Sequence, residues 1–223
     1  MRCSFMPRAH RNERAASKRA EARAGSGESV RVTDDGNDIC HVPQSPPMTW
    51  MLLARHGETD WNREGRWQGH ANVTLNNRGR EQARELAQRL AGEKFDVIYA
   101  SDLARAHETA LIIAEGKRMP VVTDPGLREI DVGSWSGLTP DQIAERFPGM
   151  VNHDGETNEQ HLARVLACFT RIARAHVGQR VLVVSHGKTL RVIRRHASGK
   201  PVALLGNCET GVLRWAGERF ETD

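Results

Sequence analysis

The sequence has few cysteines and no long apolar run. Its four cysteines, at positions 3, 40, 168 and 208 of 223 residues, form no C-x-x-C pair. This spacing favours neither a zinc site nor a disulfide framework, so we expect reduced thiols. No stretch reaches the roughly 18 apolar residues of a membrane span, and the N-terminus lacks the apolar segment of a secretory signal. We therefore expect a cytoplasmic protein without a membrane partner.

Neither sign of charge dominates the composition. The chain has 32 lysines and arginines against 28 aspartates and glutamates, a formal net charge of +4, with 39% hydrophobic and 27% charged residues. These proportions are those of an ordinary globular protein, which excludes global disorder. The small positive excess suits anionic ligands, but it is too evenly spread to indicate a nucleic-acid partner.

The first 47 residues differ in composition from the rest of the chain. An Arg/Ala/Glu run over residues 8–23 is followed by Gly25-Ser26-Gly27, an acidic patch over 34–38 and a proline-containing stretch over 43–47. Low hydrophobicity and mixed charge predict a disordered basic leader, or a weakly helical one, over residues 1–47. A transit peptide and a true start at Met48 remain open, the former despite the glutamates within the run. The length then leaves one domain over residues 48–223.

From Trp50 onward, short apolar runs alternate with segments of helical periodicity. Four runs predict strands, and three segments with apolar residues three and four apart predict helices. The strands are expected at residues 51–54, 97–100, 121–123 and 181–184, and the helices at about 83–90, 103–115 and 162–172. Strands that alternate with helices predict an α/β fold, a three-layer sandwich in which a mainly parallel sheet has helices on both faces.

Polar residues of catalytic types follow three of the predicted strands. Arg55-His56-Gly57 ends the first strand, Arg105 lies soon after the second, and His186 directly follows the fourth. In an open parallel sheet, ligands bind outside the carboxyl ends of the strands. We therefore expect these side chains to converge on one crevice, although His56 and His186 lie 130 positions apart.

This set of residue types suits the transfer of a phosphoryl group. A phosphomonoester is a dianion, and its transfer needs positive groups around the oxygens, an in-line nucleophile and an acid for the leaving oxygen. Arg55 and Arg105 can form forked hydrogen bonds to phosphoryl oxygens, and two histidines can serve as nucleophile and oxygen ligand. Glu129 is the candidate general acid. Asp131 is a second candidate, and an ion pair between Glu129 and Arg128 is the structural alternative.

Several blocks resemble the histidine phosphatase, or phosphoglycerate mutase-like, superfamily, in the order that the family has them. The first is Leu53-Ala54-Arg55-His56-Gly57-Glu58-Thr59-Asp60-Trp61-Asn62, and the others are Gln68-Gly69 and residues 75–83, 101–110, 127–137 and 183–191. The resemblance covers about residues 50–215 and is far more specific than a lone Arg-His-Gly tripeptide. It implies the phosphoglycerate mutase-like fold.

The resemblance also implies a role for each matching residue. His56 is expected to carry the phosphoryl group, and Glu129 to protonate the leaving group and then activate water. The residues expected to bind the phosphoryl group are Arg55, Asn62, Arg105 and His186. Gln68 and Gly69 are expected to border the substrate. Gly187 and Lys188 are further candidates for substrate binding, although Lys188 does not match the family. The remaining histidines lack metal-ligand spacing, so we expect neither a metal nor a cofactor.

Two positions depart from the family pattern. Asn72 stands where an aspartate is usual, which puts the local loop structure in doubt, and Lys188 stands where a small residue is usual. A cation near a helix N-terminus opposes the helix dipole, so Lys188 is expected either to point into solvent or to bind a second anionic group of the substrate. Gly187-Lys188-Thr189 imitates the end of a P-loop, but Leu182 stands where that loop needs glycine, which excludes a nucleotide hydrolase.

The short interval between Glu129 and His186 favours a phosphatase over a mutase, because the family's mutases carry a longer insertion there that encloses a bisphosphate. We expect a phosphomonoester hydrolase for small phosphorylated metabolites, acting as a monomer or a homodimer. A cofactor-dependent phosphoglycerate mutase is the alternative. A non-catalytic phosphate-binding module, with the basic leader as its docking arm, is a further interpretation, which the complete set of site residues disfavours.

Overall fold

A computed structural model describes residues 29–32, 39–42, 47–150, 152 and 154–222. The chain divides into two compact units, Met1–Pro46 and Pro47–Asp223. In the first unit, β1 (Ser29–Val32) and β2 (Ile39–Val42) pair as antiparallel strands. Most of the predicted leader lies outside the described residues, so its disorder stays a prediction.

The second unit is built on a six-stranded sheet with the strand order β5-β4-β6-β3-β7-β8. Its strands are β3 (Thr49–Arg55), β4 (Val97–Ala100), β5 (Val121–Thr123), β6 (Arg180–Ser185), β7 (Thr210–Trp215) and β8 (Phe220–Glu221). The first four are parallel, and β7 and β8 add an antiparallel edge. The prediction of a mainly parallel α/β sheet is confirmed, whereas the two antiparallel strands were not predicted.

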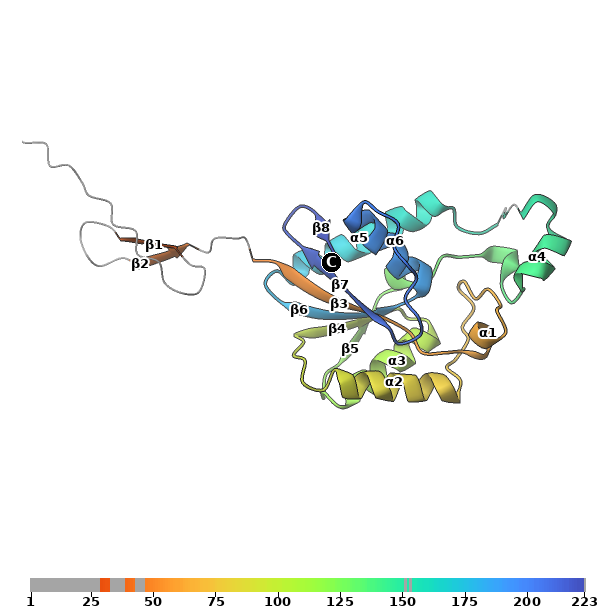
Figure 1. The fold of residues 1–223 in the computed structure, drawn as a ribbon, viewed down its shortest axis with the longest axis horizontal. Coiled ribbons are helices and arrows are strands. Elements are labelled where there is room, and N and C mark those ends of the chain that lie inside the picture. Colours follow the sequence, from red (N-terminus) through yellow and green to blue (C-terminus); the bar gives the residue numbers. More distant parts are fainter. Residues whose placement is uncertain (1–28, 33–38, 43–46, 151, 153, 223) are drawn as a thin grey trace, which may run out of the picture. The chain divides into compact units, whose positions relative to one another are not determined.

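Helices cover both faces of this sheet, with α5 and α6 on one side and α2 and α3 on the other (Figure 1). The α-helices are α1 (Asp60–Arg63), α2 (Asn77–Arg89), α3 (Ala104–Glu115), α4 (Pro140–Arg146), α5 (Asn158–Ala175) and α6 (Gly187–Ser198). Short 3-10 helices span Pro125–Leu127, Gly133–Trp135 and Pro148–Met150. The predicted three-layer sandwich is confirmed. Within the described residues, no helix has the length and apolar character needed to cross a membrane.

The apolar runs of the central strands follow from burial on two sides. In β3, Met51 and Leu53 pack toward the layer of α5 and α6, while Leu52 and Ala54 pack toward α2 and α3. Both sets are buried. Each fully buried aliphatic side chain contributes roughly 1.5 to 3 kcal/mol relative to an exposed one. An uninterrupted apolar run is therefore what a central parallel strand requires.

A third, smaller apolar cluster covers the carboxyl end of the sheet. It joins the loop after β5 to α4 and centres on Ile130, Val132, Trp135 and Ile143, with Trp67 packed against it. The helix α4 was not predicted. The sequence nevertheless marks where this helix begins, because Thr139 and Gln142 form a capping box and Pro140 occupies the first helical position.

The loop after His56 rests directly on the first turn of α2, and glycine makes this approach possible. A Cβ atom added at Gly79 would lie 2.1 Å from the Glu58 carbonyl oxygen, and one added at Gly57 would lie 2.4 Å from the Gly79 oxygen. Both contacts are with backbone, which cannot move aside as the end of a side chain can. The glycine pair therefore allows the loop after His56 to lie in direct contact with the backbone of α2.

We expect Gly79→Ala to lower the free energy of unfolding by at least about 2 kcal/mol, because the methyl group overlaps backbone atoms. Gly92→Ala is the matched control, since a Cβ atom there meets nothing within 4 Å. Urea denaturation of both variants measures the difference. Equal stability of the two variants would contradict the close approach of the loop to α2.

Candidate active site

Two histidines lie side by side at the carboxyl end of the sheet. The parallel strands β3 and β6 pair with Arg55 opposite Ser185, so His56 and His186 leave the sheet at the same level. The His56 N–H donates to the Ser185 carbonyl over 3.0 Å. The centres of the two imidazole rings are 5.1 Å apart. The structure thus brings together the ends of two strands that are remote in sequence.

The surroundings of His56 fix which ring nitrogen is free. Nδ1 lies 2.7 Å from the Gly57 carbonyl oxygen, which can only accept, so Nδ1 carries the proton in the neutral ring. Nε2 then keeps its lone pair. Burial lowers the pKa of His56 well below its usual value near 6.5, and the positive charges of Arg105 and Arg55 lower it further. A neutral imidazole with an available Nε2 is a nucleophile at neutral pH.

His186 is fully buried at the N-cap position of α6. Burial, with the charges of Arg105 and Arg55 and the neighbouring His56, lowers its pKa well below the usual value. Neither ring nitrogen has a hydrogen-bond partner within the described part of the chain. An imidazole held neutral in this way can donate one hydrogen bond to an anionic oxygen.

Two arginines flank the histidines. Arg105, in the first turn of α3, is fully buried and donates from Nη1 to the Ala71 carbonyl and from Nη2 to the Gly69 carbonyl, over 2.8 and 2.9 Å. Burial lowers its pKa to about 10, with Arg55 as a smaller cause. Arg55 donates from Nη1 to the Leu205 carbonyl over 2.9 Å, and burial lowers its pKa too. Both guanidinium groups remain charged at neutral pH.

Unsatisfied polar atoms concentrate at this site. Among the described residues, seven buried side-chain nitrogen or oxygen atoms have no hydrogen-bond partner, and five of them belong to Arg55, Gln68, Arg105 and His186. Buried polar groups without partners are costly and uncommon in folded proteins. Four of the five atoms are nitrogens of two arginines and one histidine, which are groups that bind anions. The arrangement is therefore that of a preformed anion site.

Glu129 reaches the N-terminus of α6. Its Oε2 accepts from the Lys188 N–H over 3.1 Å, and its Oε1 accepts from the N–H and the hydroxyl group of Thr189 over 3.1 and 3.2 Å. The carboxylate also interacts electrostatically with Arg55 and Arg105. Its charge therefore lies between the helix amides and the two arginines, at the edge of the anion site.

The alternative ion pair between Glu129 and Arg128 is wrong. Arg128 turns away and donates from Nε to Asp102 over 2.7 Å, and this partner lowers the pKa of Asp102. Asp131, the second candidate acid, lies with Oδ2 3.7 Å from Nδ1 of His70. Glu129 is consequently the carboxylate that faces α6 and the arginines of the site.

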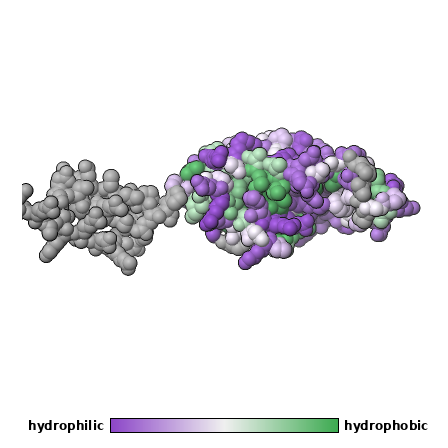
Figure 2. Space-filling model, turned by 90° about the horizontal axis from the view of Figure 1, so that it is seen from above, coloured by the Kyte–Doolittle hydropathy of each residue, from purple (hydrophilic) through white to green (hydrophobic). Residues whose placement is uncertain are grey.

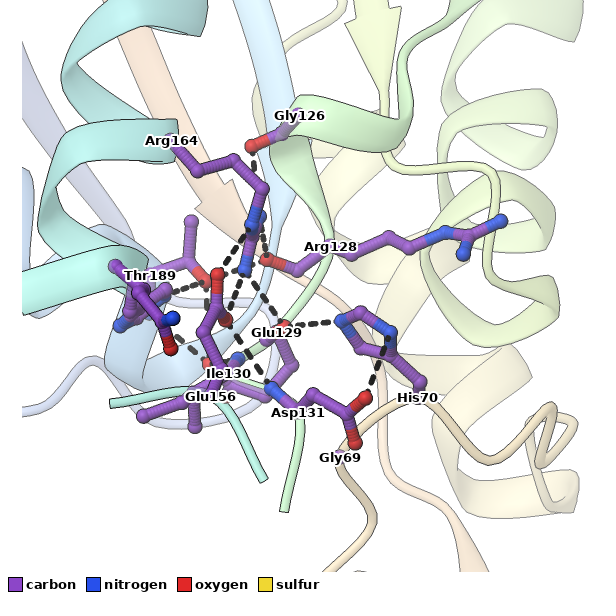
Figure 3. Close-up of polar contacts among 12 residues, drawn as sticks. Gly69, His70, Gly126, Arg128, Glu129, Ile130, Asp131, Glu156, Arg164 and Thr189 are labelled. Atoms are coloured by element: carbon purple, nitrogen blue, oxygen red, sulfur yellow. Dashed lines mark hydrogen bonds and ion pairs between the residues drawn. The ribbon is translucent and has the colours of Figure 1, made fainter. Parts of the chain in front are cut away.

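The backbone that carries Glu129 is clamped from two sides (Figure 3). Arg164 of α5 donates to the carbonyl groups of Gly126, Arg128 and Glu129 over 3.0 to 3.1 Å. Its guanidinium group also forms a forked pair with Glu156 over 2.7 and 2.8 Å. From the other side, His70 Nε2 donates to the Glu129 carbonyl over 2.8 Å, since a carbonyl can only accept. These hydrogen bonds from Arg164 and His70, called the clamp below, fix the backbone at Glu129 and so the point from which its side chain extends.

Three other predicted residues, Asn62, Gln68 and Gly69, differ in burial and in the contacts that they make. Asn62 lies in the capping box of α1, where its Oδ1 accepts from Thr59, so its amide NH₂ is the group left for a ligand. Gln68 is buried. Gly69 has φ of +48°, and a Cβ atom there would lie 2.6 Å from a methyl carbon of Val132. Its contribution is a close backbone turn whose carbonyl orients Arg105.

Gly187 and Lys188 form the first turn of α6. The N–H groups of Lys188 and Thr189 donate to Glu129. The Lys188 ammonium lies 3.6 Å from the centre of the Trp67 ring, a cation–π contact, and burial lowers its pKa. The expectation that Lys188 points freely into solvent is therefore wrong. The lysine instead bridges α6 to the loop that carries Gln68.

Asn72, the other departure from the family pattern, lies at the N-terminus of α3. Its Oδ1 accepts from the Ala104 N–H over 2.8 Å, at the first turn of α3. The N-cap residue of α3, Leu103, offers no side-chain cap of its own. Asn72 therefore caps the helix that presents Arg105, as an aspartate there also could.

Sequence reasoning missed the residues that hold the catalytic groups in place. Their partners lie far away in the sequence, as in the pairs Arg164 with Glu129 and Asn207 with the His56 carbonyl, the latter over 3.0 Å. Thr189 was noticed only as part of a P-loop imitation. His70 directly follows Gln68-Gly69, which was the one available signal. Among the described residues, no group of three or more histidine, cysteine, aspartate or glutamate side chains is placed to hold a metal ion.

Comparison with known proteins gives one consistent result. The family model described as "Histidine phosphatase superfamily (branch 1)" matches residues 51–223. The metal-independent phosphoserine phosphatase of Arabidopsis thaliana is 40% identical over 191 residues, which cover 79% of this chain and 80% of that protein. Phosphoglycerate mutase-like protein 4 of the same plant is 36% identical over 180 residues, covering 74% and 78%. The solved structure of YhfR from Bacillus stearothermophilus superposes with a TM-score of 0.73 at 31% identity, covering 78% of this chain and 95% of that one.

Proposed function

Because the chain belongs to the histidine phosphatase superfamily, we propose that it is a phosphomonoester hydrolase that works through a phosphohistidine on His56. Relatives named as phosphatases and as mutases support an enzyme. The observation that carries the proposal is the pair of buried neutral imidazoles beside two charged arginines with unsatisfied N–H groups. Its substrates are small phosphorylated metabolites.

In the first step, the phosphoryl dianion lies among Arg55, Arg105 and His186, whose N–H groups neutralise the equatorial oxygens. Nε2 of His56 attacks phosphorus opposite the leaving oxygen. A P–N bond forms as the P–O bond of the ester breaks, and the carboxyl group of Glu129 gives a proton to the leaving oxygen. The products are a free alcohol and a phosphorylated His56.

In the second step, the Glu129 carboxylate takes a proton from a water molecule that attacks the same phosphorus. The P–N bond breaks, inorganic phosphate leaves, and His56 regains its neutral state with Nδ1 still donating to the Gly57 carbonyl. Glu129 regains the proton that it donated. The cycle therefore balances without a metal or a second substrate.

The alternative is a phosphoglycerate mutase, in which the phosphohistidine transfers its phosphoryl group back to a sugar acid. The short segment between Glu129 and His186 supports hydrolysis, because its described residues form before α5 just one short α-helix, α4, and two 3-10 helices. Release of inorganic phosphate from phosphoserine, 3-phosphoglycerate, sugar phosphates, nucleotides and an aryl phosphate tests the proposal. Isomerisation of 3-phosphoglycerate without phosphate release would favour the mutase. If the protein acts on none of these compounds, a phosphate-binding module is favoured instead.

We expect EDTA to leave the activity unchanged, because Arg55, Arg105 and the two histidines supply the positive and donor groups that a metal ion supplies in other phosphatases. The similarity to a relative named metal-independent supports this. The measurement is kcat/KM on an aryl phosphate before and after chelation and dialysis. Loss of activity that a divalent ion restores would contradict the mechanism.

The lowered pKa of His56 also predicts a pH dependence. The nucleophile must be neutral, and its protonation as the pH falls inactivates the enzyme. Because the pKa lies well below 6.5, kcat/KM should persist below pH 6.5 after correction for the second ionisation of the substrate phosphate, near pH 6. An acid limb for the free enzyme at or above pH 6.5 would show that His56 is not held neutral by its surroundings.

A further inference from the structure

A groove of about 660 Å³ runs beside the candidate active site, between the N-terminus of α5 and one face of α6. Its lining follows α6 from Lys188 through Arg191 and Arg195 to Gly199. Positions 188, 191 and 195 are spaced i, i+3 and i+7, so their side chains project from the same face of the helix. That face is therefore a cationic strip along one wall of the groove.

The two arginines of this strip lack the carboxylate partners that other arginines have, whereas Lys188 interacts electrostatically with Glu129. Many other arginines pair with aspartate or glutamate, among them those at positions 63, 66, 78, 80, 128, 164, 171, 180 and 219. No ion pair is formed by Arg191 or Arg195 within the described chain. Like charges four residues apart disfavour an isolated helix, so local stability does not account for this pair.

One acidic side chain, Glu159, also lines the groove, and its charge is already engaged. It lies in the first turn of α5, where hydrogen bonds from its own backbone and from the Thr157 hydroxyl group lower its pKa. Glu159 and the adjoining Glu129, which interacts electrostatically with Lys188, are two carboxylates against three cations, so the groove keeps an excess of positive charge. Seen from the α5 and α6 side, the domain has hydrophilic areas interspersed with hydrophobic ones, among them one near the middle (Figure 2).

The groove adjoins the catalytic carboxylate. Two of its lining residues, Ile130 and Lys188, donate their backbone N–H groups to Glu129 over 3.0 and 3.1 Å. Lys188 also contacts Trp67, the residue before Gln68. A leaving group that departs past Glu129 therefore meets Lys188 first, and Arg191 and Arg195 one and two turns further on.

We propose that this groove binds a second anionic group, a phosphate or a carboxylate, on the leaving part of the substrate. The proposal rests on the proposed phosphatase function and narrows its substrate class to phosphomonoesters that carry another negative charge. Seven residues of helix separate Lys188 from Arg195, roughly 10 Å along the axis. A second charge on the leaving group can therefore meet a cation at any of three levels along this strip.

The test compares two substrates in the full-length protein. p-Nitrophenyl phosphate has a neutral leaving group, and fructose 1,6-bisphosphate has a second phosphate. We expect the ratio of kcat/KM on the bisphosphate to kcat/KM on the aryl phosphate to fall about tenfold in the double variant Arg191→Ala/Arg195→Ala, the loss typical of a charge-assisted contact near solvent. The Lys188→Ala variant is expected to lower the same ratio.

Arg194→Ala is the matched control, because Arg194 belongs to the same helix but donates to the Ala203 carbonyl and does not line the groove. Its ratio should equal that of the wild type. An unchanged ratio in the double variant, with the melting temperature maintained, would overturn the proposal, as would an equal loss in the Arg194 control. Inhibition by added bisphosphate that does not compete with the aryl phosphate would also overturn it, since the groove would then be a separate anion site.

The proposed function can fail independently. If the wild-type protein releases no phosphate from p-nitrophenyl phosphate or from any phosphomonoester, the hydrolase proposal itself is wrong. If the aryl phosphate is hydrolysed and the ratio does not respond to the groove variants, only the substrate class is wrong.

Discussion

Replacing His56 with asparagine is expected to lower kcat by at least about a thousandfold, because the reaction loses its only nucleophile. Asparagine keeps an N–H donor that can reach the Gly57 carbonyl, as Nδ1 of His56 does. It has no lone pair with the basicity of an imidazole nitrogen. The loss should therefore appear in kcat, and inhibition by inorganic phosphate should change little.

His107→Asn provides the comparison for this variant. His107 is a partly exposed histidine of α3, outside the groups that we assign to the site. We expect its kcat to stay within about twofold of the wild type, as is usual for substitutions away from a site. Near-normal turnover by His56→Asn, with phosphate inhibition intact, would mean that the nucleophile is another group.

Replacing Arg105 with alanine is expected to lower kcat/KM by at least about a thousandfold, the range seen when an arginine that stabilises a transferring phosphoryl group is removed. The guanidinium group is fully buried, so its charge acts on the phosphoryl oxygens with little screening by water. Its removal also leaves the Gly69 carbonyl group without a donor, whereas the Ala71 carbonyl group still accepts from the Val73 N–H. The unsatisfied Gly69 carbonyl costs roughly 1 to 3 kcal/mol of stability.

Two further variants separate the catalytic loss from the structural one. Arg105→Lys keeps the charge but cannot form the fork, so we expect it to recover part of the activity of the alanine variant. Arg84→Ala removes an exposed arginine of α2 and should match the wild type in urea denaturation and in kcat/KM. If Arg105→Ala retains kcat/KM within tenfold of the wild type, the arginine is structural and the assignment of the phosphoryl site is wrong.

The central sheet could be predicted from the sequence, because a strand buried on both faces produces an uninterrupted apolar run. The runs at 51–54 and 181–184 correspond to β3 and β6 within two residues at either end. The run at 121–123 corresponds to the edge strand β5, although that strand is mostly exposed. The antiparallel strands β7 and β8 were not predicted. β7 is only partly buried and contains Arg214 and Gly211, so neither a continuous run nor a clear alternation marks it.

In the site, too, some features could be predicted from the sequence and others could not. Arg55 ends β3, and His56 and His186 directly follow β3 and β6, so the topology of a parallel sheet is enough to bring them together. The clamp on Glu129 depends on long-range pairs such as Arg164 with the Glu129 carbonyl, which no local pattern encodes. The contact of Lys188 with the Trp67 ring could not be predicted from the sequence either, because it depends on how the loop after α1 packs against the start of α6.

The measurement that tests the account most directly is the trapping of the phosphorylated enzyme. The protein is mixed with a ³²P-labelled aryl phosphate, quenched with denaturant at alkaline pH within one turnover, and digested to locate the label. The account predicts one labelled peptide that contains His56, with a phosphate stable in alkali and lost in acid, and no label in His56→Asn. Label on a serine, a cysteine or an aspartate, or turnover without any labelled protein, would contradict it.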